Sequence, residues 1–566
     1  MSMQRYGNYD SAPKQYPVSA YIWGHRFRIG QDPMEYLLEF LNVLYGFDYE
    51  LGRGICDGEK QDRKSLGFKK ATRLGLRRFV FYSDTEKSRH PRDDFARKRL
   101  ENKLRQSDLI RLNPTPLGMD SGFDPVESAK SLLKSFTAVE SNRSWFARAL
   151  FPAHESLLFW EALRKKSKTE RISEDELHQI EDHELDRGME FTAANFFVRG
   201  GQLYYLLLSA GTRQDPQLAC SITSRLKFLM KDSQPSIGQL AQFIDSLWQN
   251  ESPSEELEEE DPEEGGKGRG YLGWIPEPDQ AFCHQMAEDV NKLLHAELDA
   301  TELLTLFSYL MAFQITQYIY HRSLVLSGKT EMLPRLLVDL LENSRDSSLR
   351  RASAVQFREQ ESQIRVAVQC HFEQELRTLF PGGTSWMENL RKFIDHLGDH
   401  YPVKKQDLSN HQTDLEARWS KMTGDKGIEA QRKLFQDRLE ELLMGDFNKN
   451  FEGVHRKLAK YCGFVAPLVG TPQRYVLQNN LLKTLVYANL GPAERMEFTE
   501  FLSLLYQKYG LVVGLSQARE SGLFERHRLN AEYYEMNQNM LLQKLKNAGL
   551  ALEFSDATAM VQGGQA

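Results

Sequence analysis

The stretch "DATELLTLFSYLMAFQITQYIYHRSLVL", which runs from Asp299 to Leu326, decides the fold class of this chain. It is long and largely apolar, and neither glycine nor proline interrupts it. Glycine and proline are the residues that most weaken the interior of a helix, so their absence predicts one continuous helix. We expect the whole region from Asp279 to about Phe380 to be helical.

Two further stretches favour a mainly α fold. The stretch "RRASAVQFREQESQIRVAVQCHFEQELRTLF", at 350–380, mixes apolar side chains with many charges, which predicts a helix lying across a bundle. Its apolar side chains include Val355, Ile364, Val366, Val368, Phe372 and Leu376. The stretch "GGQLYYLLLSAG", at 200–211, carries an apolar run from Leu203 to Leu208, which predicts a helix buried on most sides.

The composition limits what kind of protein the chain can form. It has 566 residues, of which 41% are hydrophobic and 27% are charged, and its formal net charge is -7. A single hydrophobic core stops growing at about 250–300 residues, so we expect a multidomain protein. The mild negative charge excludes a uniformly basic nucleic-acid coat, but it is compatible with a local basic patch.

The sequence predicts a soluble, cytoplasmic protein. No segment approaches the roughly 18 uninterrupted apolar residues of a membrane span, so we expect no membrane partner. The stretch "MSMQRYGNYDSAPKQYP", at 1–17, contains no apolar run that resembles a signal peptide. The five cysteines are scattered without any Cys-x-x-Cys spacing, which indicates a reducing compartment with neither disulfides nor a cysteine zinc site.

Composition also divides the chain into segments. The stretch "ESPSEELEEEDPEEGGKGRG", at 251–270, crowds acidic residues, prolines and glycines, so it cannot bury enough apolar surface to order itself. We expect an acidic flexible linker there; the alternative is a segment that imitates nucleic acid or docks on a basic partner. The other expected segments are a small basic region of mixed α/β structure at 1–115, a helical domain at 116–250, a helical domain at 271–425 and a C-terminal helical region at 426–566.

Three short motifs suggest chemistry, but each has a simpler structural explanation. "SGKT" at 327–330 matches the end of a phosphate-binding P-loop but lacks the earlier glycine, so we expect a turn in which Gly328 ends the preceding helix. "HLGDH" at 396–400 lacks the glutamate of a zinc-protease motif, so we expect a solvated helix end where a charged histidine complements the helix dipole. "ELHQIEDHELD" at 176–186 indicates a charged surface helix. We therefore predict a protein that is not an enzyme, with no catalytic residue, no metal site and no cofactor.

Basic residues concentrate between positions 60 and 110. Clustered cations neutralise phosphates, and aromatic residues between them can stack on bases, so this region is a candidate nucleic-acid surface. The candidate residues are Lys64, Lys69, Lys70, Arg73, Arg77, Arg78, Arg97, Lys98 and Arg99. The alternative is a basic surface that pairs with the protein's own acidic segments or with a partner protein.

The same region contains elements that resemble the metal-binding skeleton of a large nuclease superfamily. "LRRFVFYS" at 76–83 predicts a short strand, Asp84 follows it, and "ENK" stands at 101–103. In that superfamily two carboxylates hold Mg²⁺ and the lysine orients the attacking water. The family usually places Glu-x-Lys on a strand, whereas "DDFARKRLENKLRQ" predicts a basic helix here, so a metal-dependent nuclease is only a second alternative.

The C-terminal region, from about 471 to 561, resembles a winged-helix domain in the order of its expected elements. "PAERMEFTEFLSLLYQKYG" predicts a helix that begins near Pro492 and ends at Gly510, and "LVVG" predicts a brief apolar connector. "SQARESGL" predicts a short helix, and "LNAEYYEMNQNMLLQKLKNAG" predicts a long helix that ends at Gly549. "LALEFSDATAMV" then predicts a small β-hairpin.

In winged-helix proteins the third helix commonly enters the major groove of DNA. In this chain the matching face would offer Arg526, His527, Arg528, Asn530, Asn537, Gln538 and Lys544. We include Arg526, Arg528 and Lys544 among the nucleic-acid-binding candidates. Acidic residues outnumber basic ones from Gly491 onward, so phosphate contacts would gain little, and a winged helix that contacts protein is at least as compatible with the sequence.

Three stretches resemble sequences found in one group of proteins: "NFFVRGGQLYYLLLS", "YGLVVG" and "GLALEFSDATAMV". The chain resembles the large, mainly helical accessory subunits encoded in multi-gene bacterial anti-phage defence or DNA-modification-linked operons. The resemblance implies a non-catalytic scaffold or adaptor that works beside other protein subunits such as an ATPase, a helicase or a nuclease, with DNA as a further candidate partner. The alternative is a sequence-specific DNA-binding regulator.

Overall fold

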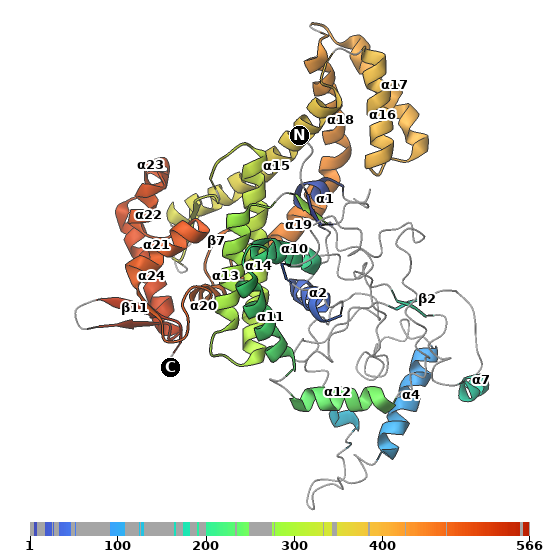
Figure 1. Cartoon of the computed structure of the whole chain (residues 1–566). Helices are drawn as coiled ribbons and strands as arrows, with labels where there is room; N and C mark the ends of the chain where they lie inside the picture. Colours follow the sequence, from blue (N-terminus) through green and yellow to red (C-terminus); the bar gives the residue numbers. More distant parts are fainter. Residues whose placement is uncertain are drawn as a thin grey trace, which may run out of the picture.

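The structure is a computed structural model in which most described residues are helical, which confirms the mainly α fold class (Figure 1). It describes residues 200–231, 235–247, 274–276, 278–331, 333–341, 348–382, 385–424, 426–470, 472–554 and 558–564, with shorter N-terminal pieces at 5–7, 17–24, 27, 33–46, 51–52, 91–107, 124, 126–129, 163–165, 174–180 and 189–191. The predicted linker at 251–270 and the predicted strand at 76–83 lie outside these residues.

Helix α14, Ala300–Leu326, runs through the middle of the fold and confirms the continuous helix predicted for this stretch (Figure 1). The carboxylate of Asp299 caps its first turn by accepting hydrogen bonds of 2.9 and 3.0 Å from the backbone N–H groups of Thr301 and Glu302. Buried residues occur on every side of the helix, because other helices surround it. The centre of the hydrophobic core therefore lies around α14.

Several helices pack against α14. They are α2 (Pro33–Gly46), α13 (Gln280–Leu294), α15 (Ser348–Leu379), α19 (Gly453–Tyr461) and α20 (Asn479–Tyr487). Helix α10, Gly200–Thr212, packs against both α2 and α13, and all of its residues are buried, as predicted. The approach of α10 to α2 depends on Gly201, where a Cβ atom would lie 2.4 Å from the backbone O of Tyr36 and the backbone N of Phe40.

Helix α15 buries only some of the apolar side chains named in its sequence. The side chains of Ile364, Val368, Phe372 and Leu376 are buried, as expected for a helix that lies across a bundle. Val355 and Val366, in contrast, are 38% and 40% exposed. Both valines fall outside the stripe of the helix that faces α14, so they contribute nothing to the core.

The remaining helices before residue 270 are smaller or more peripheral. They are α1 (Pro17–Trp23), α4 (Pro91–Gln106), α7 (Glu174–Gln179), α11 (Pro216–Lys231) and α12 (Pro235–Leu247). The described residues also form two-stranded antiparallel sheets: β1 (Arg5–Gly7) with β4 (Trp274–Pro276), β2 (Leu163–Lys165) with β3 (Met189–Phe191), and β6 (Val465–Ala466) with β7 (Arg474–Tyr475). None of the described helices is both long and apolar enough to cross a membrane.

Three helices form an arm that extends away from the centre of the fold (Figure 1). They are α16 (Trp386–His400), α17 (Lys405–Lys421) and α18 (Ile428–Phe447). The indole rings of Trp386 and Trp419 stack with centroids 4.4 Å apart and hold α16 against α17. A short π-helix, Asn448–Glu452, continues α18 into α19 and so connects the arm to the central helices.

The C-terminal part contains alternating helices and short strands. Its elements after α20 are β8 (Arg495–Glu497), α21 (Phe498–Tyr509), β9 (Leu511–Val512), α22 (Leu515–Glu520), α23 (Leu523–His527), α24 (Ala531–Asn547), β10 (Ala551–Glu553) and β11 (Ala559–Gln562). β10 and β11 form the predicted hairpin, and β8 adds to β11, giving an antiparallel sheet in the order β10-β11-β8. The predicted short helix and long helix correspond to α22 and α24.

Two predictions in this part are wrong. The helix that ends at Gly510 begins at Phe498 rather than near Pro492, because Arg495–Glu497 pairs with β11 as a strand. "LVVG" is more than a connector, since Leu511–Val512 pairs in parallel with β5, Leu336–Leu337. In both cases the strand forms on a partner that is distant in the sequence.

The pairing of β5 with β9 connects residues on either side of the predicted segment boundary at 425. The backbone N–H of Leu336 donates a 2.8 Å hydrogen bond to the carbonyl of Gly510, and the N–H of Val338 donates one of 3.0 Å to the carbonyl of Val512. Gly510 has a φ of 72°, and a Cβ atom there would lie 2.2 Å from the carbonyl oxygen of Pro334. Residues from both sides of that boundary contribute to one continuous hydrophobic core.

Candidate functional site

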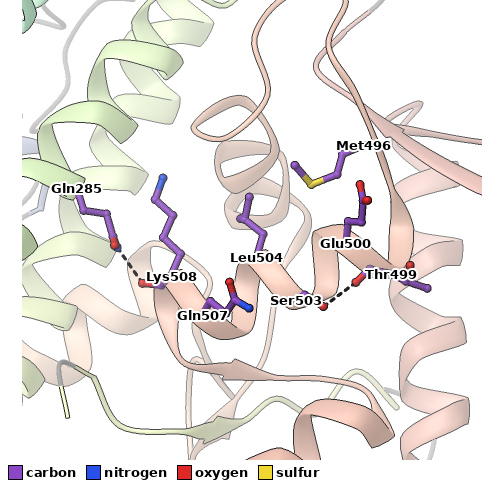
Figure 2. Close-up of a pocket in the computed structure, with 8 residues that line it drawn as sticks. All are labelled: Gln285, Met496, Thr499, Glu500, Ser503, Leu504, Gln507 and Lys508. Carbon is purple, nitrogen blue, oxygen red and sulfur yellow. Dashed lines mark hydrogen bonds between the residues drawn. The ribbon is translucent and has the colours of Figure 1, made fainter.

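A groove runs along the surface of α21, with Gln285 of α13 near one end and Met496 of β8 near the other (Figure 2). The cavity has a volume of about 670 Å³. Its lining residues are Gln285 from α13, Met496 from β8, and Thr499, Glu500, Ser503, Leu504, Gln507 and Lys508 from α21. The amide of Gln285 donates a 2.8 Å hydrogen bond to the backbone carbonyl of Lys508, which fixes the spacing of the two helices at this end.

The local sequence of α21 explains why its polar side chains face the groove. The apolar side chains of α21 form one buried stripe, which consists of Phe498, Phe501, Leu502, Leu505 and Tyr509. Thr499, Ser503 and Gln507 recur every four residues, so they share a neighbouring face of the helix. The stripe holds that face at the surface, and the groove gains hydroxyl and amide groups.

A buried ion pair lies behind the Lys508 end of the groove. The ammonium group of Lys508 bonds to the carboxylate of Asp289 on α13 and donates a 2.9 Å hydrogen bond to Oδ1 of Asn489. The Asp289 side chain is 1% exposed, whereas that of Lys508 is 18% exposed. Lys508 therefore reaches both the groove and the buried carboxylate.

The carboxylate of Asp289 is also the centre of a hydrogen-bond network. Its Oδ2 accepts a 3.0 Å bond from the hydroxyl of Tyr509 and a 3.3 Å bond from Nε2 of Gln314 on α14. Gln314 Oε1 in turn accepts a 2.5 Å bond from the hydroxyl of Tyr204 on α10. Asn489 Nδ2 donates a 2.8 Å bond to the oxygen of Tyr509. The network therefore connects α10, α13, α14 and α21.

Burial dominates the acid–base properties of this network. It raises the pKa of Asp289 to about 6, although the charge of Lys508 and the hydrogen bonds of Lys508, Tyr509 and Gln314 oppose the rise. Burial also raises the pKa values of Tyr204 and Tyr509 well above their ordinary values, and the Asp289 carboxylate contributes to both shifts. Both phenols stay protonated at neutral pH and act as hydrogen-bond donors.

The groove and the network have different roles. Thr499, Ser503, Gln507 and Gln285 can donate and accept hydrogen bonds, so the groove can bind a polar ligand. Asp289 is too deeply buried to touch such a ligand, and the phenol of Tyr509 is fully occupied by Asp289 and Asn489. The arrangement suits binding, with the network holding α21 in position.

Most of the basic N-terminal candidates lie outside the described residues: Lys64, Lys69, Lys70, Arg73, Arg77 and Arg78. Three others are on α4. The guanidinium of Arg97 pairs with Glu101 at 2.7 Å, and that of Arg99 donates a 2.5 Å bond to the carbonyl of Ile180, while Lys98 is exposed. The carboxylate proposed for a nuclease site, Glu101, is on a helix, and its suggested partner Asp84 lies outside the described residues.

The C-terminal candidates do not gather on one open face. Arg526 pairs with Glu359 of α15 at 2.7 Å. Arg528 is exposed and ends α23 with a φ of 49°. Lys544 on α24 directs its ammonium group toward the carbonyl oxygen of Leu477 at 3.5 Å.

The expectation that Asn537 lies on a DNA-reading face of α24 is wrong. Its side chain is 0% exposed and is used entirely inside the fold. Its amide nitrogen donates bonds of 2.9 and 3.0 Å to the carbonyls of Val338 and Val513, and its oxygen accepts a 2.8 Å bond from the N–H of Leu340. Asn537 therefore positions the segments that contain β5 and β9.

The histidine motif on α16 forms contacts with α15. Nε2 of His396 lies 2.7 Å from a carboxylate oxygen of Glu375, and the hydroxyl of Tyr401 donates a 2.7 Å bond to the other oxygen. Burial by itself would raise the pKa of Glu375. The hydrogen bond with His396 and the charge of the nearby His371 lower this pKa by more than burial raises it, so the net shift is downward. Within the described parts of the chain, no group of three or more His, Cys, Asp or Glu side chains could hold a metal ion.

The "SGKT" motif forms the turn that was predicted. α14 ends at Leu326, Ser327 caps it, and Gly328 follows with a φ of 71°. The ammonium group of Lys329 donates a 2.8 Å bond to the side chain of Gln363 on α15. These residues end α14 and contact α15, and the chain then continues to β5, Leu336–Leu337.

Comparison with known proteins gives no relative for this chain. No protein-family model, curated protein or solved structure matches it.

Proposed function

We propose that this chain is a non-catalytic scaffold or adaptor subunit of a bacterial DNA-processing or antiviral defence complex. In this proposal a winged-helix-like unit at the C-terminus contacts other protein subunits. The order α20, β8, α21, α24, β10 and β11, with the sheet order β10-β11-β8, is compatible with such a unit. β9, α22 and α23 stand between α21 and α24 as an addition to it.

The observation that favours protein contacts over DNA reading is the use of the polar residues near α24. Asn537 is buried, Lys544 points toward the carbonyl of Leu477, and Arg526 pairs with Glu359. A helix that reads DNA needs such side chains free to reach base edges and phosphates. Asn537 is therefore out of reach of nucleic acid, and Lys544 and the 55% exposed Arg526 would have to leave their present partners in the chain to bind it.

Exposed apolar side chains on the same unit support the protein-binding role. Leu552 within β10 and Phe554 just after it are 41% and 46% exposed, and Met536 on α24 is 48% exposed. Leu552 and Phe554 are two positions apart, so they project from one side of the chain. Large apolar side chains at the surface are common in contacts between proteins.

Co-purification from the native host tests this proposal. A tagged chain at its natural level should bring down partner subunits in a fixed ratio, and changing Leu552 and Phe554 together to Asp should reduce the yield of partners at least ~10-fold. The matched control is Val355→Asp with Val366→Asp, which adds the same charges at two exposed valines of α15. Recovery of the chain as a solitary monomer would sink the proposal.

A DNA-binding regulator is the second candidate, since the order of elements suits that role equally well. It requires specific duplex binding that tolerates moderate salt and is lost when Arg526 and Arg528 are both changed to Ala. Because Arg526 pairs with Glu359, the control is Glu359→Ala, which breaks the pair and keeps both arginines. Tight specific binding that survives in the control but not in the double variant would favour the regulator over the adaptor.

A further inference from the structure

β8 has a free edge beside the groove of α21. Among the residues that the structure describes, the sheet order is β10-β11-β8, so this strand pairs with β11 on one side and with no described strand on the other. The N–H of Gly563 donates a 3.1 Å bond to the carbonyl of Glu494. This bond shows that the backbone groups of Glu494, and by alternation those of Met496, point toward β11. In an antiparallel pair, every second residue turns its backbone groups away from the partner strand, so those of Arg495 and Glu497 face outward.

The groove begins at this edge and has the length of a short peptide. Met496 is on β8 and lines one end of the groove, while Lys508 lines the other (Figure 2). The helix rises about 14 Å between Thr499 and Lys508, at ~1.5 Å per residue. About four residues of extended chain cover that length, at ~3.3 Å per residue.

The charges around the groove favour a basic occupant. Glu500 lines the groove, Glu497 is the last residue of β8, and Glu494 directly precedes this strand. All three glutamates are exposed. The positive charge of Lys508 is matched by Asp289, so among these residues Arg495 alone opposes the three carboxylates. An acidic rim repels nucleic-acid phosphates and attracts lysine or arginine.

We propose that the groove binds a short extended segment of a partner protein, which carries a basic side chain and adds to the free edge of β8. The N–H and carbonyl of Arg495 and the N–H of Glu497 supply the strand hydrogen bonds, whereas the carbonyl of Glu497, the N-cap of α21, belongs to the first turn of that helix. Glu500 pairs with the basic side chain, and the hydroxyl and amide groups of α21 satisfy polar groups of the segment. This proposal rests on the adaptor function proposed above and specifies the chemistry of one partner.

Glu497 provides a sharp pair of variants. Its φ is -59°, which proline adopts without strain, so Glu497→Pro removes one outward N–H and keeps the backbone path. Glu497→Gln removes the same charge and keeps the N–H. Strand addition therefore predicts a larger loss of binding for Glu497→Pro than for Glu497→Gln, whereas simple charge attraction predicts equal losses.

The probes are two fluorescein-labelled peptides with equal strand propensity, Ser-Val-Lys-Val-Lys-Val and Ser-Val-Glu-Val-Glu-Val, titrated with the full chain by fluorescence anisotropy. We expect the basic peptide to bind below 1 mM, ~10-fold more tightly than the acidic one, which corresponds to about 1.4 kcal/mol. Glu497→Pro should weaken the basic peptide at least ~5-fold and Glu497→Gln at most ~2-fold, and Glu500→Lys should also weaken it ~5-fold. Each variant is first checked for wild-type helicity and melting temperature.

The possible outcomes separate this inference from the adaptor function. Equal affinity for both peptides, no binding of either at 1 mM, or equal losses for the two Glu497 variants would overturn the strand-addition proposal. If partner subunits still co-purify in those cases, the adaptor function stands and uses another surface. If the peptide binds as expected but no partner co-purifies, the groove stands and the adaptor function fails.

Discussion

The hydroxyl of Tyr509 on α21 donates a 3.0 Å hydrogen bond to the buried carboxylate of Asp289 on α13, although 220 positions separate the two residues. The neighbouring Lys508 supplies the positive charge that this carboxylate needs. A buried carboxylate without a partner is strongly unfavourable, so these contacts hold α21 against the central helices. The groove on the outer side of α21 depends on that position.

The first prediction concerns the two partners of this ion pair. Lys508→Met leaves the carboxylate of Asp289 buried beside an apolar side chain, which should lower the free energy of unfolding by about 3–5 kcal/mol. Asp289→Asn keeps an oxygen for Tyr509 and leaves a lysine that can reach water in the groove, so a smaller loss of about 1–2 kcal/mol is expected. Urea unfolding followed by circular dichroism measures both changes.

The double variant supplies the decisive comparison. Asp289→Asn combined with Lys508→Met should cost less than the sum of the single changes by at least ~1 kcal/mol, because neither partner is left alone. The matched control is the exposed pair of Lys433 and Asp437 on α18, where Lys433→Met should cost below ~1 kcal/mol. Additive effects at Asp289 and Lys508 would contradict the ion pair.

The second prediction is the pH dependence that Asp289 contributes. Its pKa is raised from the ordinary 3.8 to about 6 in the folded chain, so the folded state binds its proton more tightly than the unfolded state. The contribution of this group to stability therefore increases as the pH falls from about 6 to 4, and is lost as the pH rises through about 6. Compared with Asp289→Asn, the wild type should gain on the order of 1–3 kcal/mol over that range. A difference that stays constant in urea unfolding at pH 4.5, 5.5 and 7 would rule this out.

The third prediction concerns His455, whose contribution has the opposite sign. Burial, with a smaller effect of the Arg456 charge, lowers its pKa to about 3, and its Nε2 lies 3.0 Å from the hydroxyl of Tyr320. The unfolded chain protonates this histidine below about pH 6.5 while the folded chain does not, so stability falls as the pH drops from about 6.5 toward 3. His455→Gln should be about 1–3 kcal/mol less stable at pH 7, and the gap should narrow in acid. A gap that widens in acid would mean that His455 is protonated in the folded chain.

Local patterns in the sequence predicted the long helices and the hairpin of β10 and β11, but not the strands β8 and β9. α14 and α10 were predictable because their apolar residues are spread around the whole helix. Such a helix has to be covered by other helices, whichever helices those are. Arg495–Glu497 and Leu511–Val512 are strands only because β11 and β5 offer partners, and nothing in two or three residues reveals a distant partner. The exposed Val355 on α15 shows the same limit, since an apolar residue indicates burial only when it lies on the packed stripe.

The candidate site was less predictable than the fold. Asp289 and Lys508 each read as ordinary charges on amphipathic helices, and only their contact gives them a role. Asn537 had a usable signal: it stands three residues after Tyr534 and four before Leu541, which places it on the buried stripe of α24. A polar residue on a buried stripe indicates a structural hydrogen-bond network before it indicates an exposed contact with DNA.

The fourth prediction tests the contact between α10 and α2. Gly201→Ala places a Cβ atom 2.4 Å from the backbone of Tyr36 and Phe40, so the helices must move apart at a fully buried position. We expect a loss of about 2–4 kcal/mol in the free energy of unfolding, although alanine is the better helix former. Thermal melting followed by circular dichroism should show a clear decrease in the melting temperature.

Gly445 on α18 is the matched control, because a Cβ atom there would meet no atom within 4 Å. With no clash, Gly445→Ala should change only the helix propensity of this position. It should therefore raise the free energy of unfolding by about 0.5–1 kcal/mol. The two substitutions are chemically identical and both fall within helices, so opposite signs isolate the effect of the interhelical contact. Stabilisation by both would mean that α10 and α2 are not packed as closely as this structure has them, and the position of the core around α14 would need revision.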